Sequence, residues 1–226
     1  MKITYLGHAC LQLELAGKII IVDPFISGNP LAAHIDVNSL KADYILLTHA
    51  HGDHIADVES IAALNGSTLI CNAEMSYYYD AKGFKTVGMN TGGKFGIDGI
   101  TIKSTIAFHS SSFPDGTYGG NPNGYVLEAD GKRIYIAGDT ALTQEMKLIP
   151  EITGKLDLAV LPVGDHFTMG YEDACIASNF IQCNRIIGYH FDTFPPIKID
   201  HQKAKDHFSA QGKVLILPKI GESITV

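Results

Sequence analysis

The first part of the chain holds short apolar-rich runs that predict strands. These runs cover residues 3–6, 10–15 and 19–22. The second run alternates apolar and polar residues, which is typical of a strand with one buried face, and the third is a β-branched run. Residues 16–18 predict a turn, and residues 26–42 predict a loop because they hold glycine, asparagine and proline. This part therefore predicts a meander of strands joined by hairpins.

From residue 44 the pattern predicts strands and helices in alternation. The continuous apolar run at 44–47 predicts a buried strand, and 68–71 predicts another strand. The apolar spacing over 55–64 predicts a helix, and 73–82 is a further candidate helix. Further strands are predicted within 84–108 and at 125–128, 133–137, 158–161, 185–189 and 214–217. Asp130-Gly131 predicts a hairpin turn, and helices are predicted near 142–152, 171–183 and 201–210.

Two successive halves thus each pass from strands to alternating strands and helices. This order favours two sheets packed face to face, with helices on the outer faces. The chain has 226 residues, of which 46% are apolar and 18% charged, a globular balance. No low-complexity linker or short repeat interrupts it, so we expect one domain over residues 1–226.

Charge and composition narrow the range of partners. The formal net charge is −7 and the basic residues are scattered, whereas a nucleic-acid partner favours clustered positive charge. No apolar run approaches the ~20 residues that cross a bilayer, and the first residues do not resemble a signal peptide. The four cysteines show no CxxC spacing, which favours reduced thiols. We expect a cytoplasmic protein with a small-molecule substrate and without a nucleic-acid or membrane partner; a homo-oligomer is compatible with the sequence.

Histidine and aspartate residues follow several of the predicted strands. These are His49, His109, Asp139, the pair Asp165-His166, and His190. Because ligands bind where the carboxyl ends of strands gather at one edge of a sheet, side chains far apart in the sequence can converge there. The positions therefore predict one shared site.

The densest group is an HxHxDH motif made by His49, His51, Asp53 and His54. Spacing by two along an extended segment points the first two imidazoles the same way, and Gly52 allows a tight turn before the others. Neutral imidazole and carboxylate bind zinc and similar divalent ions. Four potential ligands within six residues are too many for one ion with an open position, so the motif predicts two ions.

HxHxDH after a buried strand resembles the signature of the metallo-β-lactamase superfamily. Asp23, His109, Asp139 and His190 occur in the order expected for the family's remaining site residues. Gly7-His8-Ala9-Cys10, the segment 164–170 and the segment 189–196 resemble a family of metal-dependent hydrolases related to the ascorbate-6-phosphate lactonases. The resemblance implies a four-layer αββα sandwich with two divalent metal ions per chain; zinc, manganese, nickel and iron all suit this ligand set.

The resemblance also implies roles for the individual residues. One ion would take His49, His51 and His109, the second would take Asp53, His54 and His190, and Asp139 would bridge them. Asp53 would also orient the nucleophile or carry its proton. Asp23 would orient a ligand from outside the ligand set, and His8 would line the pocket. From their own positions in the chain, we expect His166 to bind substrate or transfer a proton, and loop 110–122, which directly follows His109, to form the rim of the site.

The function implied is a binuclear, metal-dependent hydrolase that uses a metal-bridging hydroxide on a lactone, ester, amide or phosphoester. One alternative is a phosphodiesterase or nuclease on the same site, which the acidic charge disfavours. A redox di-iron centre is disfavoured because such relatives carry glutamate where His51 stands. A metal- or ligand-binding protein without catalysis is the remaining alternative, and turnover that depends on added metal would exclude it.

Overall fold

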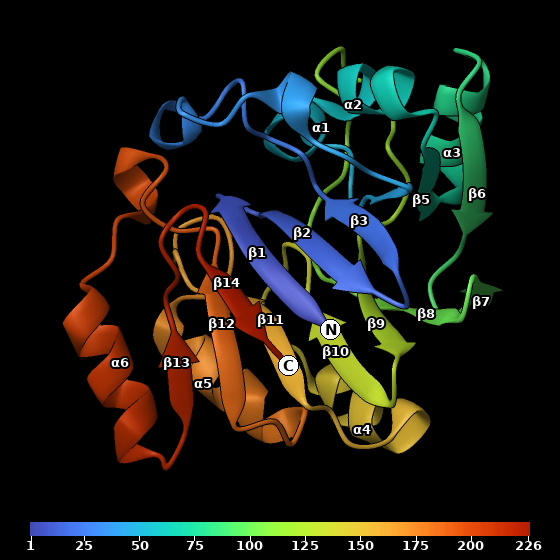
Figure 1. Ribbon diagram of the computed structural model, residues 1–226. Coiled ribbons are helices and arrows are strands. Elements are labelled where there is room, and N and C mark those ends of the chain that lie inside the picture. The colour runs from blue at the N-terminus through green and yellow to red at the C-terminus, as the bar shows by residue number, and fades with distance from the viewer.

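The computed structural model describes residues 1–226 and shows two seven-stranded sheets packed against each other (Figure 1). The strand order is β14-β1-β2-β3-β4-β5-β6 in the first sheet and β13-β12-β11-β10-β9-β8-β7 in the second. Helices α1–α3 lie on the upper side of Figure 1 and α4–α6 on the lower side. Both sheets are mixed and have helices on their outer faces.

The first half of the chain builds all but one strand of the first sheet. Its strands are β1 (Lys2–Gly7), β2 (Cys10–Leu15), β3 (Lys18–Val22), β4 (Tyr44–Leu46), β5 (Thr68–Asn72) and β6 (Lys85–Met89). Its helices are the short 3-10 turns η1 (Pro30–Ala32) and η2 (Val37–Ser39) and the α-helices α1 (Gly52–Ile55), α2 (Val58–Asn65) and α3 (Ala73–Asp80).

The second half builds the second sheet and returns to the first. Its strands are β7 (Lys94–Ile97), β8 (Ile100–Ile106), β9 (Asn123–Ala129), β10 (Lys132–Ile136), β11 (Leu158–Pro162), β12 (Arg185–Tyr189), β13 (Val214–Ile216) and β14 (Ser223–Thr225). Its helices are η3 (Gln144–Lys147), α4 (Leu148–Thr153), α5 (Tyr171–Phe180), η4 (Pro195–Ile197) and α6 (His201–Ala210).

The two sheets repeat the same arrangement of strand directions. In the first sheet β14, β1, β2 and β3 pair antiparallel, and β3, β4, β5 and β6 pair parallel. In the second sheet β7 to β10 pair antiparallel, and β10 to β13 pair parallel. The parallel strands point their carboxyl ends to a common edge, which is where ligands bind in such sheets.

Three buried apolar clusters separate four layers. The central cluster contains residues of both sheets, such as Leu13 and Ile20 from the first and Leu127 and Val160 from the second. A second cluster lies between the second sheet and helices that include α5 and α6, and a third lies between the first sheet and helices that include α2 and α3. This arrangement confirms the predicted αββα sandwich.

The prediction of one helix over 55–64 is wrong, because the segment forms two helices. Helix α1 begins earlier, at Gly52, and α2 begins at Val58. Asp57 lies at the break, where its carboxylate accepts hydrogen bonds from the N–H groups of Ile26 (2.6 Å) and Ser27 (3.0 Å). That tie to the loop after β3 forces the chain out of a continuous helix.

Strand β14 (Ser223–Thr225) lies beyond 214–217, the last strand that the sequence pattern predicts. It is short, and Ile224 is the one buried residue in it. Its register pairs Lys2 with Thr225 and Thr4 with Ser223, so it extends the first sheet beside β1. A single apolar residue is too little to predict a strand from the sequence. The segment becomes a strand because its backbone pairs with β1.

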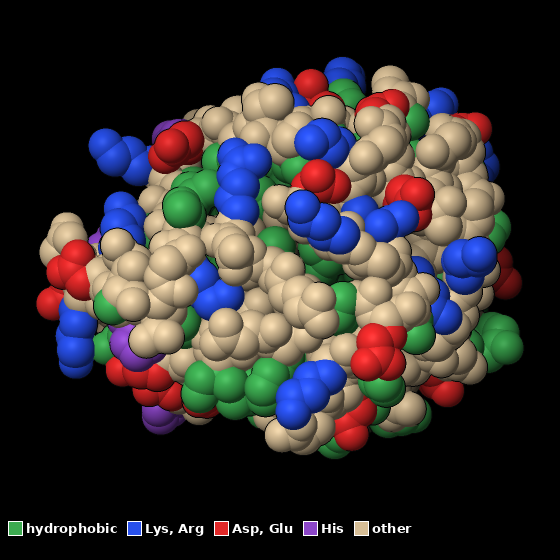
Figure 2. All heavy atoms as spheres, turned by 90° about the horizontal axis from the view of Figure 1, so that it is seen from below, with side chains coloured by type: hydrophobic (Ala, Val, Ile, Leu, Met, Phe, Trp, Pro, Cys, Tyr) green, Lys and Arg blue, Asp and Glu red, His purple; other side chains and the backbone are tan.

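The helices and the surface add two observations. None of the helices combines the length and the apolar character that a membrane-spanning segment needs. The face seen from below carries lysine and arginine side chains among aspartate and glutamate side chains (Figure 2).

A hydrogen bond across the sandwich supplies a test of how the sheets are held together. The Tyr125 hydroxyl on β9 donates to the Leu47 carbonyl, which follows β4, at 3.0 Å inside the core. Tyr125→Phe should lower the free energy of unfolding by about 1–3 kcal/mol, because it leaves a buried carbonyl without that partner. Urea titration followed by circular dichroism measures the change.

Tyr135→Phe is the matched control. Tyr135 is also fully buried, but its hydroxyl has no hydrogen-bond partner. Its removal should cost less than removal of the Tyr125 hydroxyl. Equal losses in the two variants would show that the Tyr125–Leu47 bond does not stabilise the sandwich.

Candidate metal centre

Side chains from six segments meet at the edge where the strands end. His8 follows β1, Asp23 follows β3, His49 follows β4, His109 follows β8, Asp139 follows β10 and His190 follows β12. His51, Asp53 and His54 join them from the start of α1. The structure therefore brings together residues that lie as far apart as positions 8 and 190.

One group consists of three histidines. His49, His51 and His109 each offer a ring nitrogen, and these nitrogens lie within 4.8 Å of one another. His49 Nε2 lies 3.0 Å from His51 Nδ1, and the ring of His109 is 5.1 Å from each of the other two rings. This is the set expected to hold the first ion.

A second group lies beside the first and contains four residues. His8, Asp53, His54 and His190 offer donor atoms that also lie within 4.8 Å of one another. Three of these are the residues expected around the second ion. His8 was expected only to line the pocket, and the structure places it against Asp53.

Asp139 lies between the two groups. Its Oδ2 atom is 3.0 Å from His190 Nε2, 3.4 Å from His54 Nε2 and 3.6 Å from His109 Nε2. One carboxylate oxygen thus faces imidazoles of both groups, as a bridging ligand would.

Asp23 orients two of the histidines from behind. It accepts hydrogen bonds from the Thr48 N–H (2.8 Å) and hydroxyl (2.6 Å). Its Oδ2 also lies 2.9 Å from His54 Nδ1. Because the Thr48 hydroxyl donates to Asp23, it accepts from His49 Nδ1 at 3.0 Å.

These bonds place a proton on Nδ1 of both rings. His49 and His54 donate through Nδ1, so Nε2 of each ring faces the other site residues. A carboxylate behind an imidazole fixes its tautomer in the same way at many metal sites.

Charge and burial shift the pKa values of the site in a consistent way. Burial and the neighbouring His54 hold the pKa of His49 well below its usual value, and burial and His190 lower the pKa of His8 to about 4. Both rings are therefore neutral at pH 7, the state of an imidazole that binds metal.

The Asp139 carboxylate is held ionised. Burial alone would raise the pKa of Asp139, but the His190 and His54 imidazoles beside it keep it well below its usual range. For His54, burial would lower the pKa, yet Asp139 and Asp23 hold it well above the usual value. The space between these two carboxylates therefore favours a positive charge.

Several polar atoms of the site have no hydrogen-bond partner although they are buried. These are His54 Nε2, Asp139 Oδ1 and both ring nitrogens of His190. The short separations from Asp139 Oδ2 are not among the hydrogen bonds of the site, and these atoms lie close together around that carboxylate. Unpartnered buried groups are rare and costly. A metal ion is a suitable partner for this donor set, and the residues present fit the metal that the resemblance implies.

The backbone is unusual at the same strand ends. His8, Asp23 and His190 have φ values of 54°, 42° and 55°, in the left-handed region that non-glycine residues seldom adopt. Such conformations persist where surrounding contacts hold them, and they cluster at functional sites.

His166 lies apart from these groups. It follows β11 as expected, but its side chain is exposed, and no hydrogen bond, ion pair or ring contact joins it to the other site histidines. The contact that its ring makes is with Phe167, at 4.5 Å. Its role in substrate binding or proton transfer stays a prediction.

Loop 110–122 adjoins the motif. The Ser110 hydroxyl lies 3.2 Å from His51 Nε2, and the Ser111 hydroxyl accepts from the Ala50 N–H at 3.2 Å. Further along, Phe113 is buried and stacks on Tyr78 with ring centroids 3.7 Å apart. The loop therefore begins at the edge of the site and is anchored beside it.

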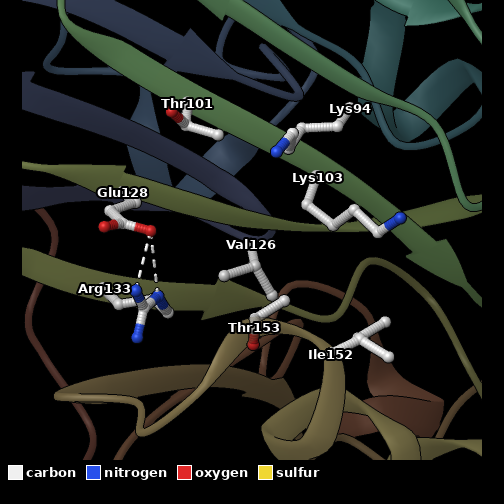
Figure 3. A pocket seen from close by; sticks show the side chains of 8 residues that line it. All are labelled: Lys94, Thr101, Lys103, Val126, Glu128, Arg133, Ile152 and Thr153. Atoms are coloured by element: carbon white, nitrogen blue, oxygen red, sulfur yellow. Dashed lines mark hydrogen bonds and ion pairs between the residues drawn. The ribbon is translucent and has the colours of Figure 1, made fainter.

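Two hollows show how the site relates to the surface. One, of about 440 Å³, is lined by His8 and Thr193 together with Tyr5, Phe191 and the Asp192–His201 pair. Another, of about 310 Å³, lies on the outer face of the second sheet against α4 (Figure 3). Its polar side chains include Lys94, Lys103 and the Glu128–Arg133 pair, but no histidine. Of these two hollows, the first shares a wall with the candidate metal centre through His8.

Thr48 and Thr193 are functional candidates to which the sequence pattern assigned no role, although both lie within or beside the motif segments. Thr48 links Asp23 to His49, and Thr193 Oγ1 lies 3.0 Å from His8 Nδ1. Their positions in the sequence pointed toward the site, because Thr48 directly precedes the HxHxDH motif and Thr193 lies three residues after His190. Threonine is common near strand ends, so position alone did not distinguish these two.

Comparison with known proteins places the chain in a family. The profile of the β-lactamase superfamily domain matches residues 2–190. A UPF0173 metal-dependent hydrolase of Flavobacterium johnsoniae is 61% identical over 224 residues, which cover 99% of each chain. The predicted relation to ascorbate-6-phosphate lactonases stays a prediction.

Solved structures agree in fold. Igni18, a metallo hydrolase of the archaeon Ignicoccus hospitalis, aligns with a TM-score of 0.89 and 34% identity over 99% of this chain and 97% of that one. An isothiocyanate hydrolase from Delia radicum gut bacteria aligns with a TM-score of 0.80 over 100% and 99%; at 23% identity it shows the fold alone. The chain described here belongs to the UPF0173 metal-dependent hydrolase family of the metallo-β-lactamase superfamily.

Proposed function

We propose that this protein hydrolyses a small-molecule lactone, ester, amide or phosphoester at a centre that holds two divalent ions. The observation that carries the proposal is the pair of adjacent donor groups with Asp139 between them. His49, His51 and His109 would hold one ion, and Asp53, His54 and His190 the other. When bound, the ions supply a water of lowered pKa and polarise the oxygen of the group under attack.

The chain's own residues would prepare the site for that chemistry. Asp23 and Thr48 hold Nδ1 of His54 and His49 and so orient both rings before any ligand binds, which leaves little rearrangement to be made. Asp139 is held ionised and can balance the charge of both ions.

Asp53 is the residue best placed to handle a proton. Its side chain is 31% exposed, more than the other carboxylates of the site, and Oδ1 has no hydrogen bond. Burial would raise the pKa of Asp53, but the hydrogen bond with His8 and the nearby His54 keep it below its usual range. It is therefore an ionised carboxylate that can hold the attacking water or accept its proton.

A small-molecule substrate agrees with the charge of the protein. The net charge is −7, and basic side chains lie among acidic ones on the face shown in Figure 2. Nucleic-acid backbones are bound through clustered cations. Lactones, esters and phosphoesters need no such surface.

The first test is of the ligand set. His51→Ala should reduce the bound metal from two ions toward one per chain, and Asp139→Ala should reduce it for both sites. Turnover should fall in parallel in each variant, by about 100-fold or more, because loss of electrostatic stabilisation costs about that much. Elemental analysis of the purified variants gives the metal content, with His34→Ala, an exposed histidine, as control. Two ions per chain in both variants would contradict the assignment.

The second test is of Asp23. Asp23→Asn keeps the side-chain shape but replaces one acceptor oxygen, so either the Thr48 N–H loses its acceptor, or the Thr48 hydroxyl and the His54 ring both do. Metal affinity should fall by about 10–100-fold, the usual cost of losing such an orienting group. Competition with a chromophoric chelator measures it.

Asp57→Asn is the matched control for that test. Asp57 is likewise buried, but it holds Ile26 and Ser27 rather than a histidine. It should lower the stability of the fold and leave metal affinity close to wild type. Similar metal affinities in Asp23→Asn and Asp57→Asn would show that Asp23 does not orient the metal ligands.

The third test is of turnover itself. Protein stripped with a chelator and reloaded with zinc or manganese should hydrolyse at least one class in a panel of lactones, p-nitrophenyl esters and p-nitrophenyl phosphates. Stripped protein and Asp139→Ala should not. Metal-loaded protein without turnover on the panel, but with tight binding of one of these compounds, would favour a binding protein over an enzyme.

A further inference from the structure

His8 makes a contact that the proposed metal ligands do not explain. It follows β1 and is fully buried. Its Nε2 lies 3.1 Å from Asp53 Oδ2, and its Nδ1 lies 3.0 Å from Thr193 Oγ1. The two partners come from segments 45 and 185 residues away. Both ring nitrogens of His8 are therefore engaged, whereas those of His190 have no partner.

The ring of His8 is held from several sides. It packs edge-on against Phe25 and Phe194, each at 5.4 Å, and lies 4.1 Å from the ring of His190. The His8 carbonyl accepts a hydrogen bond from the His190 N–H at 2.9 Å.

The turn that carries His8 is equally constrained. Gly7 has a φ of 106°, and a Cβ atom there would lie 2.7 Å from Asn29 Nδ2. His8 itself is in the left-handed region. Contacts on every side thus set where the imidazole points.

The direction of the hydrogen bonds follows from valence. An ionised carboxylate has no hydrogen to donate, so the proton between His8 and Asp53 belongs to Nε2. A neutral imidazole protonated at Nε2 has its lone pair on Nδ1, and Thr193 must then donate to it. The other acceptor within reach of the Thr193 hydroxyl, the Phe191 carbonyl, is farther away at 3.4 Å.

We propose that His8 and Thr193 are positioning residues that hold the Asp53 carboxylate through a chain of hydrogen bonds from Thr193 to His8 to Asp53. This inference rests on the proposed function of Asp53. His8 takes Oδ2 and stops the carboxylate from rotating, so Oδ1, which has no hydrogen bond, would stay available to the second ion or the attacking water. Thr193 keeps the proton of His8 on the nitrogen that faces Asp53.

The competing assignment makes His8 itself a ligand of the second ion, since its donor atom lies within the same 4.8 Å group. The two assignments place the proton on opposite nitrogens. A positioning residue carries it on Nε2; a ligand through Nε2 carries it on Nδ1. The tautomer of His8 therefore decides between them.

Nitrogen-15 NMR of histidine-labelled protein loaded with zinc reads this tautomer directly, and the signal is assigned by its loss in His8→Phe. We expect a proton on Nε2 and a bare Nδ1. A metal-bound Nε2 with a proton on Nδ1 would overturn the proposal. Wild-type protein that binds fewer than two zinc ions would contradict the proposed function instead, and the His8 tautomer is read from the same spectrum.

Metal titration of variants tests the consequence. His8→Phe keeps an aromatic ring between Phe25 and Phe194 but removes the donor to Asp53, so the second zinc ion should bind about 10–100-fold more weakly. The ion held by His49, His51 and His109 should bind as in wild type. Unchanged affinity for both ions would overturn the positioning role.

Variants of Thr193 test the role of its hydroxyl, because a serine in its place should restore the hydrogen bond to His8 that a valine removes. Thr193→Val keeps the shape but removes the hydroxyl, and should mix the two tautomers of His8 and weaken the second ion. Thr193→Ser should restore both readings. Thr105→Val, at a buried threonine whose hydroxyl has no partner, is the matched control and should resemble wild type. Identical spectra and affinities for Thr193→Val and Thr193→Ser would overturn the proposal.

Discussion

The candidate metal centre depends on the buried carboxylate of Asp23. It lies at the end of β3, fully buried, and accepts hydrogen bonds from the Thr48 backbone, the Thr48 hydroxyl and the His54 ring. Through the hydroxyl it also sets the tautomer of His49. One anion thus ties β3 to the segment after β4 and orients histidines of both donor groups. Because Asp23 does not belong to either set of proposed ligands, it can do this before a metal arrives.

The rest of the centre is a problem of charge. His54 and Asp139 are both fully enclosed, and each shifts the pKa of the other toward the charged form. Several donor atoms around them have no partner in the protein. A buried site with this balance is costly for the fold unless a cation shares it. Buried charges and unpartnered donor atoms would destabilise an ordinary core, but they suit a site that binds metal ions.

Much of the fold could be predicted from local pattern. Residues 10–15, 185–189 and 201–210 form the elements predicted for them, because their apolar spacing and flanking turn residues agree with their tertiary surroundings. The helix over 55–64 failed because Asp57 is bound by the distant loop after β3. Strand β14 was missed because one buried residue, Ile224, carries its whole pattern.

By itself, the sequence determined the HxHxDH motif, the order of the later histidines and aspartates, and the alternation that builds two sheets. All of these are local or ordinal properties of the chain. Only the tertiary structure decided that His8 contacts Asp53 and Thr193, that Thr48 lies between Asp23 and His49, and that His166 stays outside the group. A side-chain hydrogen bond needs its two atoms within about 3 Å of each other. Packing of strands from both halves of the chain sets such a distance, and no spacing along the sequence encodes it.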